Sequence, residues 1–440
     1  MLDRRSVLLG GVAFLGGCAA GALRPAGAAA EFVRREGAEL RIGARPYRFA
    51  GANMWYAAYL GADAPFGNRA RLGRELDRLA ALGVDNVRIL ASSELSPLRG
   101  SITPAFRTIS TDYNETLLRG LDFALAEMGR RGMRAVLYLT NFWEWSGGMM
   151  TYLSWTNGGR YLNMNDPAHP WPQFPDFASS FYSNRQAVAL YEHYVGALVS
   201  RTNTVTGGAY AADPTIMSWQ LANEPRPGGS EAVGTRNLPA YLAWISGTAR
   251  LIKSLDANHL VSTGSEGLKG CIESEECVTA AHAPAEIDYL TAHIWPANWG
   301  WAALADIAGT WAATEVNTRQ YIRQHIDFAA RLGKPLVIEE FGYPRDGGSF
   351  DPAARTTLRD RFYAIIYDAV RASAEARGPL IGSNFWAWSG EGRAARADRR
   401  FRPGDAYLGD PPHEPQGWYG VFDRDESSKA LIGAQARALA

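Results

Sequence analysis

One order of segments recurs along this chain: an amphipathic helical stretch, then a glycine or turn, then a short apolar run. The stretch 69–82, for example, leads through Gly83 into the apolar run 86–90, and the same order returns around Gly132 and Gly333. Continuous short apolar runs are typical of parallel strands that are buried on both faces. The recurrence therefore predicts helices that alternate with parallel strands.

Eight such runs can be counted, and eight strand–helix units predict an α/β fold, a (β/α)8 TIM barrel with a single catalytic domain over residues 31–440. A doubly wound open sheet is the alternative, but it usually carries a glycine-rich phosphate loop after its first strand, and 51–55 is no such loop. The expected strands are 47–53, 86–90, 135–139, 216–222, 260–263, 289–294, 336–338 and 381–386. The expected helices are 69–82, 113–131, 186–200, 238–255, 273–281, 318–332 and 355–376.

The start of the chain, 1–30, is expected to be an export signal with a lipobox and linker. Arg4-Arg5 and the short apolar run after them resemble a twin-arginine signal, and 15–18 resembles a bacterial lipobox in which Cys18 is lipidated. A plain secretory signal cut near 28–30 is the alternative. The apolar run is far shorter than the roughly 20 residues that a membrane span needs. We therefore expect export, to the periplasm, to the outer membrane as an anchored lipoprotein, or otherwise by secretion.

Charge, cysteine content and metal-binding motifs indicate which partners and cofactors to expect. Lys plus Arg and Asp plus Glu both total 45, so the chain as a whole has no electrostatic footprint for nucleic acid. After Cys18, only Cys271 and Cys277 occur, and both a disulfide and two reduced thiols remain open. Neither Cys/His metal spacing nor a His-Glu-x-x-His motif is present, so we expect no metal and no other cofactor. A monomer is expected.

Polar and aromatic residues interrupt the apolar runs at their C-terminal ends, which is where barrels of this kind carry their function. Taken alone, each has an ordinary structural explanation: a lone histidine is more often structural, and two adjacent glutamates can both be solvated. Together they are harder to explain in that way, because buried carboxylates are costly unless they are paired or used. The strand ends carry Trp55, Tyr56, Arg88, Trp143, Asn223, Glu224, His293, Trp295, Glu339, Glu340, Trp386 and Trp388.

Two facing carboxylates among aromatic rings suit retaining glycoside hydrolysis. One carboxylic acid protonates the leaving oxygen, and the other carboxylate attacks the anomeric carbon. The two roles need different pKa values, and Arg88 beside a glutamate would keep that glutamate ionised. The chain has 14 Trp, whose flat faces suit sugar rings but also fill large cores. Serine-type hydrolysis is not indicated, because no Gly-x-Ser-x-Gly motif occurs.

From about Phe49 to the C-terminus, the sequence resembles glycoside hydrolase family 5. Leu221-Ala222-Asn223-Glu224-Pro225 matches the acid/base motif of the family, and Ile338-Glu339-Glu340-Phe341-Gly342 matches its nucleophile motif. Within the family, the sequence is most similar to the bacterial branch of endo-β-1,4-mannanases, which is subfamily 7-like. The segments that carry this closer similarity are 141–148, 293–299, 384–393 and 409–422.

The resemblance implies that Glu224 is the general acid and base and that Glu340, directly before the aromatic–Gly pair, is the nucleophile. The chain has Trp295 where much of the family has Tyr, and we expect its indole N–H to donate towards Glu340. The strand-three His of many cellulase branches is absent, which argues mildly against a cellulase. The substrate-binding residues are expected to be Trp55, Tyr56, Arg88, Trp143, Asn223, His293, Trp295, Trp386 and Trp388.

The function expected from this resemblance is endo-hydrolysis of β-1,4-mannosidic linkages in mannans. A β-1,4-glucanase or an exo-acting β-mannosidase on the same machinery are alternatives, because loops decide both the contact with the sugar 2-hydroxyl and the closure of the cleft. A non-catalytic sugar-binding lipoprotein is a further alternative, which the presence of both Glu224 and Glu340 disfavours. The expected partner is a polysaccharide or oligosaccharide substrate, and membrane contact is expected only through the lipid anchor.

Overall fold

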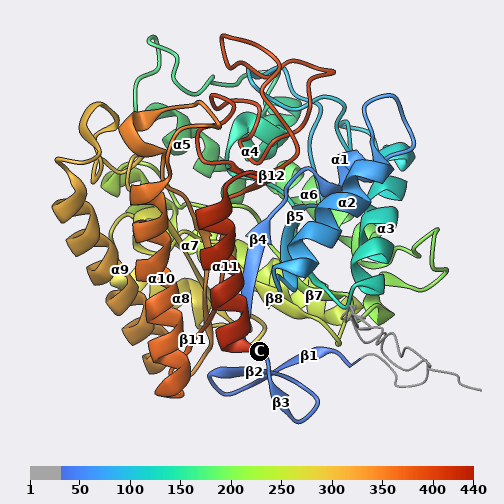
Figure 1. Ribbon diagram of the computed structural model, residues 1–440. Helices are drawn as coiled ribbons and strands as arrows, with labels where there is room; N and C mark the ends of the chain where they lie inside the picture. The colour runs from blue at the N-terminus through green and yellow to red at the C-terminus, as the bar shows by residue number, and fades with distance from the viewer. Residues whose placement is uncertain (1–30) are drawn as a thin grey trace, which may run out of the picture. The chain divides into compact units, whose positions relative to one another are not determined.

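Eight parallel strands form the centre of the molecule in the computed structural model, which describes residues 31–440 as one compact unit. The strands are hydrogen-bonded in the order β8-β7-β6-β5-β4-β11-β10-β9, and a bridge between Ser262 and Tyr289 joins β8 to β9. The prediction of a (β/α)8 barrel is therefore confirmed, and the open sheet is excluded (Figure 1). The barrel strands are β4 (Phe49–Asn53), β5 (Asn86–Leu90), β6 (Arg134–Tyr138), β7 (Ile216–Gln220), β8 (Leu260–Ser262), β9 (Leu290–Ile294), β10 (Leu336–Phe341) and β11 (Leu380–Phe385).

The helices surround the strands, and several begin where the sequence supplies a side-chain cap. Asn68, Asn114 and Asn184 each accept a hydrogen bond from a backbone N–H in the first turn of the helix that follows. Gly333 ends α9 in the left-handed conformation, at a φ of 62°. The helices are α1 (Ala57–Gly61), α2 (Arg69–Ala81), α3 (Glu115–Arg130), α4 (Gly148–Thr156), α5 (Gln173–Ala178), α6 (Arg185–Val199), α7 (Glu231–Leu255), α8 (Glu275–His282), α9 (Trp311–Leu332), α10 (Thr357–Glu375) and α11 (Glu426–Leu439).

Some elements were not expected from the sequence. Before the barrel, β1 (Val33–Glu36), β2 (Glu39–Ile42) and β3 (Arg45–Pro46) form an antiparallel sheet. Val33 and Leu40 of this sheet join a buried cluster with residues at the starts of the barrel strands, so the sheet covers the N-terminal end of the barrel (Figure 1). Near the C-terminus, β12 (Trp388–Gly390) pairs with β13 (Val421–Phe422). These elements, with α1, α4, α5 and α11, lie outside the strand–helix repeat that guided the prediction.

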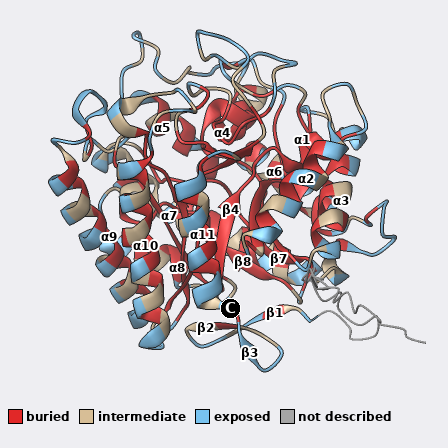
Figure 2. Cartoon of the chain, viewed as in Figure 1, coloured by how far each residue is buried: buried red, intermediate tan, exposed pale blue. Residues whose placement is uncertain are grey.

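Burial explains the continuous apolar runs. Every residue of the eight barrel strands is buried, whereas the surrounding helices expose one face (Figure 2). Polar residues inside these strands, such as Arg88 and Gln220, must therefore find partners within the barrel. Cys271 and Cys277 are both buried, free thiols.

The predictions of an export signal and of no membrane span are separate from the barrel. The export signal and Cys18 lie outside the described residues. Within residues 31–440, no helix has the length and apolar character needed to cross a membrane.

Candidate active site

A cavity of about 750 Å3 opens at the C-terminal ends of the barrel strands. Glu224 follows β7, Glu340 lies at the end of β10, and both line the cavity. Half of the tryptophans of the chain line it as well, and they come from loops far apart in sequence. These seven are Trp143, Trp145, Trp171, Trp295, Trp299, Trp386 and Trp418.

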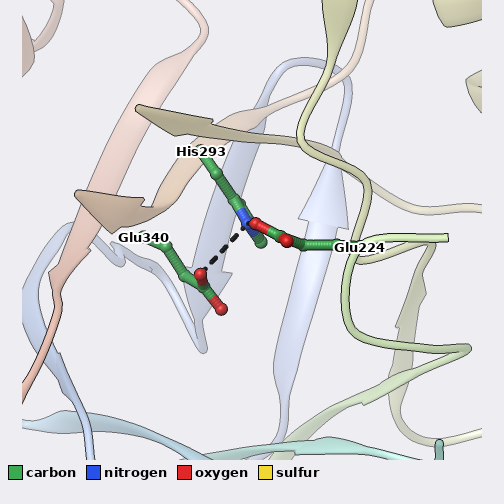
Figure 3. A group of neighbouring side chains, drawn as sticks. All are labelled: Glu224, His293 and Glu340. Carbon is green, nitrogen blue, oxygen red and sulfur yellow. Dashed lines mark hydrogen bonds and ion pairs between the residues drawn. The ribbon is translucent and has the colours of Figure 1, made fainter. Parts of the chain in front are cut away.

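Glu224 and Glu340, which line this cavity, both lie close to the fully buried side chain of His293 (Figure 3). The Nδ1 atom of His293 lies 2.7 Å from Oε1 of Glu224 and 3.3 Å from Oε2 of Glu340. One atom from each of the three side chains can be chosen so that all lie within 4.8 Å of one another. The two carboxyl groups therefore face the same small volume, with the imidazole between them.

Glu340 owes its orientation to an irregularity in β10. Ile338 pairs with Ala292 of β9, but Glu340 pairs with the next residue, His293, so Glu339 is an extra residue in β10. Such a bulge changes the direction of consecutive side chains. Glu340 reaches the cavity and contacts the Arg88 guanidinium, whereas Glu339 lies deeper.

Glu339 has a different environment from its neighbour. Both of its carboxylate oxygens accept hydrogen bonds from Nε2 of Gln220, at 2.6 and 2.7 Å. It does not line the cavity, and its Oε2 lies 3.8 Å from Nε of Arg88. Of the two adjacent glutamates, only Glu340 is therefore open to a substrate in the cavity.

Glu224 is held from several sides. Its φ is 52°, a left-handed conformation that costs a residue with a side chain about 1–3 kcal/mol, and such conformations cluster at functional sites. Its Oε1 accepts from His293 and, at 3.2 Å, from the indole N–H of Trp295, while its Oε2 accepts from the indole N–H of Trp143. The expectation that Trp295 donates towards Glu340 is wrong, because the indole reaches the oxygen of Glu224 that already accepts from His293.

The charges of this cluster set its protonation. Burial alone would raise the pKa of Glu224, but the hydrogen bond and positive charge of His293 outweigh burial and hold this pKa below its usual value. Burial would lower the pKa of His293, but the charge of Glu340 and the hydrogen bonds to the carboxylates raise it well above 6.5. The His293–Glu224 hydrogen bond therefore holds a proton at neutral pH, and the imidazole carries it.

Asn223 and Arg88 are joined to this cluster by hydrogen bonds. The Arg88 guanidinium donates to Oδ1 of Asn223 at 2.7 Å and to Oε1 of Gln220 at 2.7 Å, and it stacks on the ring of Tyr138. Asn223 lines the cavity, and Arg88 lies beneath it, fully buried. Arg88 therefore acts on the cavity through Glu340 and Asn223.

Five of the nine predicted substrate-binding residues do not line the cavity. Arg88 and His293 are fully buried beneath it, and the other three are Trp55, Tyr56 and Trp388. The indole N–H of Trp55 donates to the carbonyl of Gly409, and the hydroxyl of Tyr56 donates to the carbonyl of Trp388. The indole N–H of Trp388 donates to Glu75 on α2. All three are buried with their polar atoms bonded inside the protein, so the prediction that they bind substrate is corrected: they join the loops to the helices.

An ion pair beside Glu224 was missed from the sequence. The Arg226 guanidinium makes two hydrogen bonds to Glu266, at 2.6 and 2.7 Å, and both side chains line the cavity. Arg226 also stacks over the rings of Trp143 and Trp171, at 4.9 and 5.8 Å from their centroids. The position of Arg226 directly after the Asn-Glu-Pro motif could have marked it as a site residue. Nothing in the sequence, however, pairs it with Glu266.

The chain segment before β13 also contributes to the cavity. Pro411, His413, Glu414, Pro415 and Trp418 line it. Burial raises the pKa of Glu414 to about 8, so this carboxyl group is largely protonated at neutral pH and can donate a hydrogen bond. In the sequence, this segment is recognisable only by its resemblance to the family.

The carboxylates of Glu224 and Glu340 with the imidazole of His293 form a donor set that could also hold a divalent cation. In the structure, however, Nδ1 of His293 is occupied by hydrogen bonding, and the Arg88 guanidinium contacts Glu340. The positive charge of Arg88 opposes a cation at this position. The arrangement thus fits acid–base chemistry better than metal binding.

Comparison with known proteins identifies the family. Residues 30–440 match the model described as GH family 5 beta-mannosidase-like. The chain belongs to glycoside hydrolase family 5. As a member of this family it is a glycoside hydrolase, and the family resemblance read from its motifs is confirmed.

This family 5 glycoside hydrolase has plant and fungal relatives. It is 32% identical over 361 residues to mannan endo-1,4-beta-mannosidase 4 of Oryza sativa subsp. japonica, which covers 77% of this chain and 69% of the relative. The structure of a family 5 mannosidase from Rhizomucor miehei matches with a TM-score of 0.84 and 33% identity, covering 94% of this chain and 98% of the other. An endo-1,4-beta-mannanase from the same fungus, at 22% identity and a TM-score of 0.67, shares the fold.

Proposed function

We propose that this glycoside hydrolase cleaves β-1,4-mannosidic linkages in mannans with retention of the anomeric configuration. The observation that carries the mechanism is the closeness of Glu224 and Glu340, whose nearest oxygens lie within 4.8 Å in the cluster with His293. Retaining enzymes hold their carboxyl groups about 5–5.5 Å apart, whereas inverting enzymes need about 6.5–9.5 Å to admit water. The short separation supports a double displacement.

In the first step, Glu340 attacks the anomeric carbon and forms a glycosyl-enzyme, while the leaving oxygen takes a proton from Glu224. The Arg88 guanidinium hydrogen-bonds to Glu340 and orients it for this attack. When the sugar displaces water, the charged pair of His293 and Glu224 loses its solvation. The imidazole can then pass its proton along their hydrogen bond to Glu224, which acts as the acid. In the second step, Glu224 removes a proton from water, which releases the sugar and restores Glu340.

The choice of mannan rests on the relatives. The rice protein and the Rhizomucor miehei enzyme are named for mannan or mannoside hydrolysis, and a mutant of the latter is solved with mannosyl-fructose. We extend this specificity to the present chain and place it in the endo-acting mannanase branch that its motifs resemble. Seven tryptophans along one cavity support binding of several sugar rings.

An exo-acting β-mannosidase is the second candidate. The Rhizomucor miehei enzyme, matched over 98% of its length at a TM-score of 0.84, favours it, because that enzyme is named a mannosidase. The two activities use the same carboxylates and differ in the length of the substrate that the cavity accepts.

We expect the purified enzyme to hydrolyse linear mannan and to leave carboxymethyl-cellulose unchanged. Product analysis on both polymers, side by side, tests the sugar specificity, and NMR of the first product tests for the β-anomer that a retaining enzyme releases. Early products of mixed length indicate endo action, whereas mannose alone indicates exo action. Faster hydrolysis of carboxymethyl-cellulose than of mannan would contradict the proposed specificity.

We also propose that the protein is exported and lipidated at Cys18, because the Arg4-Arg5 pair and the lipobox-like 15–18 stand before the catalytic domain. One acyl chain binds membranes only marginally, whereas the several chains of a lipoprotein anchor stably. The Cys18→Ser variant should therefore move from the membrane fraction to the soluble fraction with its activity intact. Unchanged membrane association would contradict lipidation.

A further inference from the structure

A second cavity, of about 300 Å3, adjoins the catalytic one. It lies between the segment around α8 and helix α9, which pack against each other. Lys269 and Glu273 line both cavities and form an ion pair with each other. This ion pair therefore lies where the two cavities adjoin.

The lining of the second cavity combines amides with aromatic rings. Asn317, Gln320 and Gln324 lie on one face of α9, at helical spacings of three and four residues. Asn317 and Gln324 are half-buried and Gln320 is exposed, and among residues 31–440 none of the three amides hydrogen-bonds to another residue. Trp301 and Phe328 line the same space. Free amides beside aromatic rings suit sugar hydroxyls and sugar faces.

The Lys269 ammonium marks the passage from one cavity to the other. It lies 5.9 Å from the ring centroid of Trp299 in the catalytic cavity and 5.8 Å from that of Trp301 in the second. The two indoles are themselves in edge contact, with centroids 4.9 Å apart. Aromatic rings therefore continue from the catalytic cavity into the second one.

Hydrogen bonds link the second cavity to the segment that follows Glu224. Arg226, two residues after Glu224, is bound to Glu266, whose carbonyl accepts a hydrogen bond of 2.6 Å from the hydroxyl of Tyr321 on α9. That hydroxyl in turn accepts from the backbone N–H of Lys269, and Tyr321 lines the second cavity. Because the general acid protonates the leaving oxygen, the sugars on its side are those of the leaving group.

We propose that the second cavity is a distal subsite for the leaving-group end of a β-1,4-linked mannan chain. The inference rests on the proposed function and deepens it, since a subsite beyond the catalytic cavity serves only a long substrate. A chain that enters it crosses the Lys269–Glu273 pair and places sugar hydroxyls against the free amides of α9. The enzyme is then adapted to polymer and acts within the chain.

The test compares a long and a short substrate in matched variants. Replacing Asn317 and Gln324 together by Ala removes two hydrogen-bonding side chains, and a net hydrogen bond changes an equilibrium about fivefold. We expect the KM for mannohexaose to rise about tenfold or more, with kcat/KM for p-nitrophenyl β-mannoside unchanged. Arg323→Ala, exposed on the same helix and outside the cavity, is the control and should change neither value.

Each outcome separates the inference from the function on which it rests. An unchanged KM for mannohexaose, or an equal loss on both substrates, overturns the distal subsite while β-mannoside hydrolysis stands. The same holds if the wild-type enzyme shows no preference for mannohexaose over mannotriose. Failure of the wild-type enzyme to hydrolyse any mannoside overturns the proposed function, and with it a subsite for mannan. As a second variant, Trp301→Ala should raise the KM for mannohexaose, and Trp301→Phe should restore it in part.

Discussion

Replacing Glu340 by Ala should lower kcat by about 10⁴-fold or more on every substrate, equivalent to about 5 kcal/mol of lost transition-state stabilisation. The methyl group cannot form the glycosyl-enzyme, and no other carboxylate that lines the cavity contacts Arg88 as Glu340 does. The loss should not depend on the leaving group, because the missing bond forms in the first step. Steady-state kinetics on mannan and on an activated aryl mannoside would measure it.

The adjacent Glu339 provides a matched control. Its carboxylate is bound to Gln220 below the cavity, so Glu339→Gln should change the packing of the floor without removing the nucleophile. We expect it to retain far more activity than Glu340→Gln, with both variants folded by circular dichroism. The reverse order of activities would show that the nucleophile within the pair is wrongly chosen.

The barrel was predictable because burial leaves a strong signal. Strands buried on both faces must be apolar throughout, and the eight observed strands, from β4 to β11, lie within a few residues of the expected ranges. The N-terminal sheet and helices such as α4 escaped because they lie outside the repeat of helix, glycine and strand. Their positions depend on contacts with loops that are distant in the sequence.

The two glutamates that we propose as catalytic were recognisable from motifs, but their surroundings were not. The choice between Glu339 and Glu340 rests physically on a bulge in β10, which depends on the register against β9 and leaves no mark in the sequence. Trp55 illustrates the opposite error. It follows a strand end, but the chain turns at once into α1, and the indole packs against the C-terminal segment at Gly409 rather than in the cavity.

The partner of Trp295 could not be read from the sequence either. Strand order places this indole near both carboxylates, and only the conformation of the loop after β9 decides between them. The left-handed backbone of Glu224 brings its carboxylate towards Trp143, Trp295 and His293 together. A motif names the residue, but such a φ value follows from the packing of the whole barrel.

Replacing Glu224 by Ala should reveal its role through the leaving group. General acid–base catalysis contributes about 10²–10⁴-fold, and we expect a loss of that size on mannan, whose leaving sugar needs a proton. A dinitrophenyl mannoside needs little protonation, so its first step should stay fast and the glycosyl-enzyme should accumulate. A burst of dinitrophenolate followed by slow turnover, measured by stopped-flow absorbance, is the expected result.

Azide tests the same assignment from the product side, because it attacks the anomeric carbon without help from a base. In Glu224→Ala, azide reacts with the glycosyl-enzyme formed on Glu340, and two inversions give β-mannosyl azide. In Glu340→Ala, azide can only take the place of the missing nucleophile, and a single inversion gives α-mannosyl azide. NMR distinguishes the two anomers. If Glu224→Ala gave the α-anomer, or Glu340→Ala the β-anomer, the roles of the two glutamates would have to be exchanged. The anomer formed depends on the face of the sugar at which the remaining carboxylate lies.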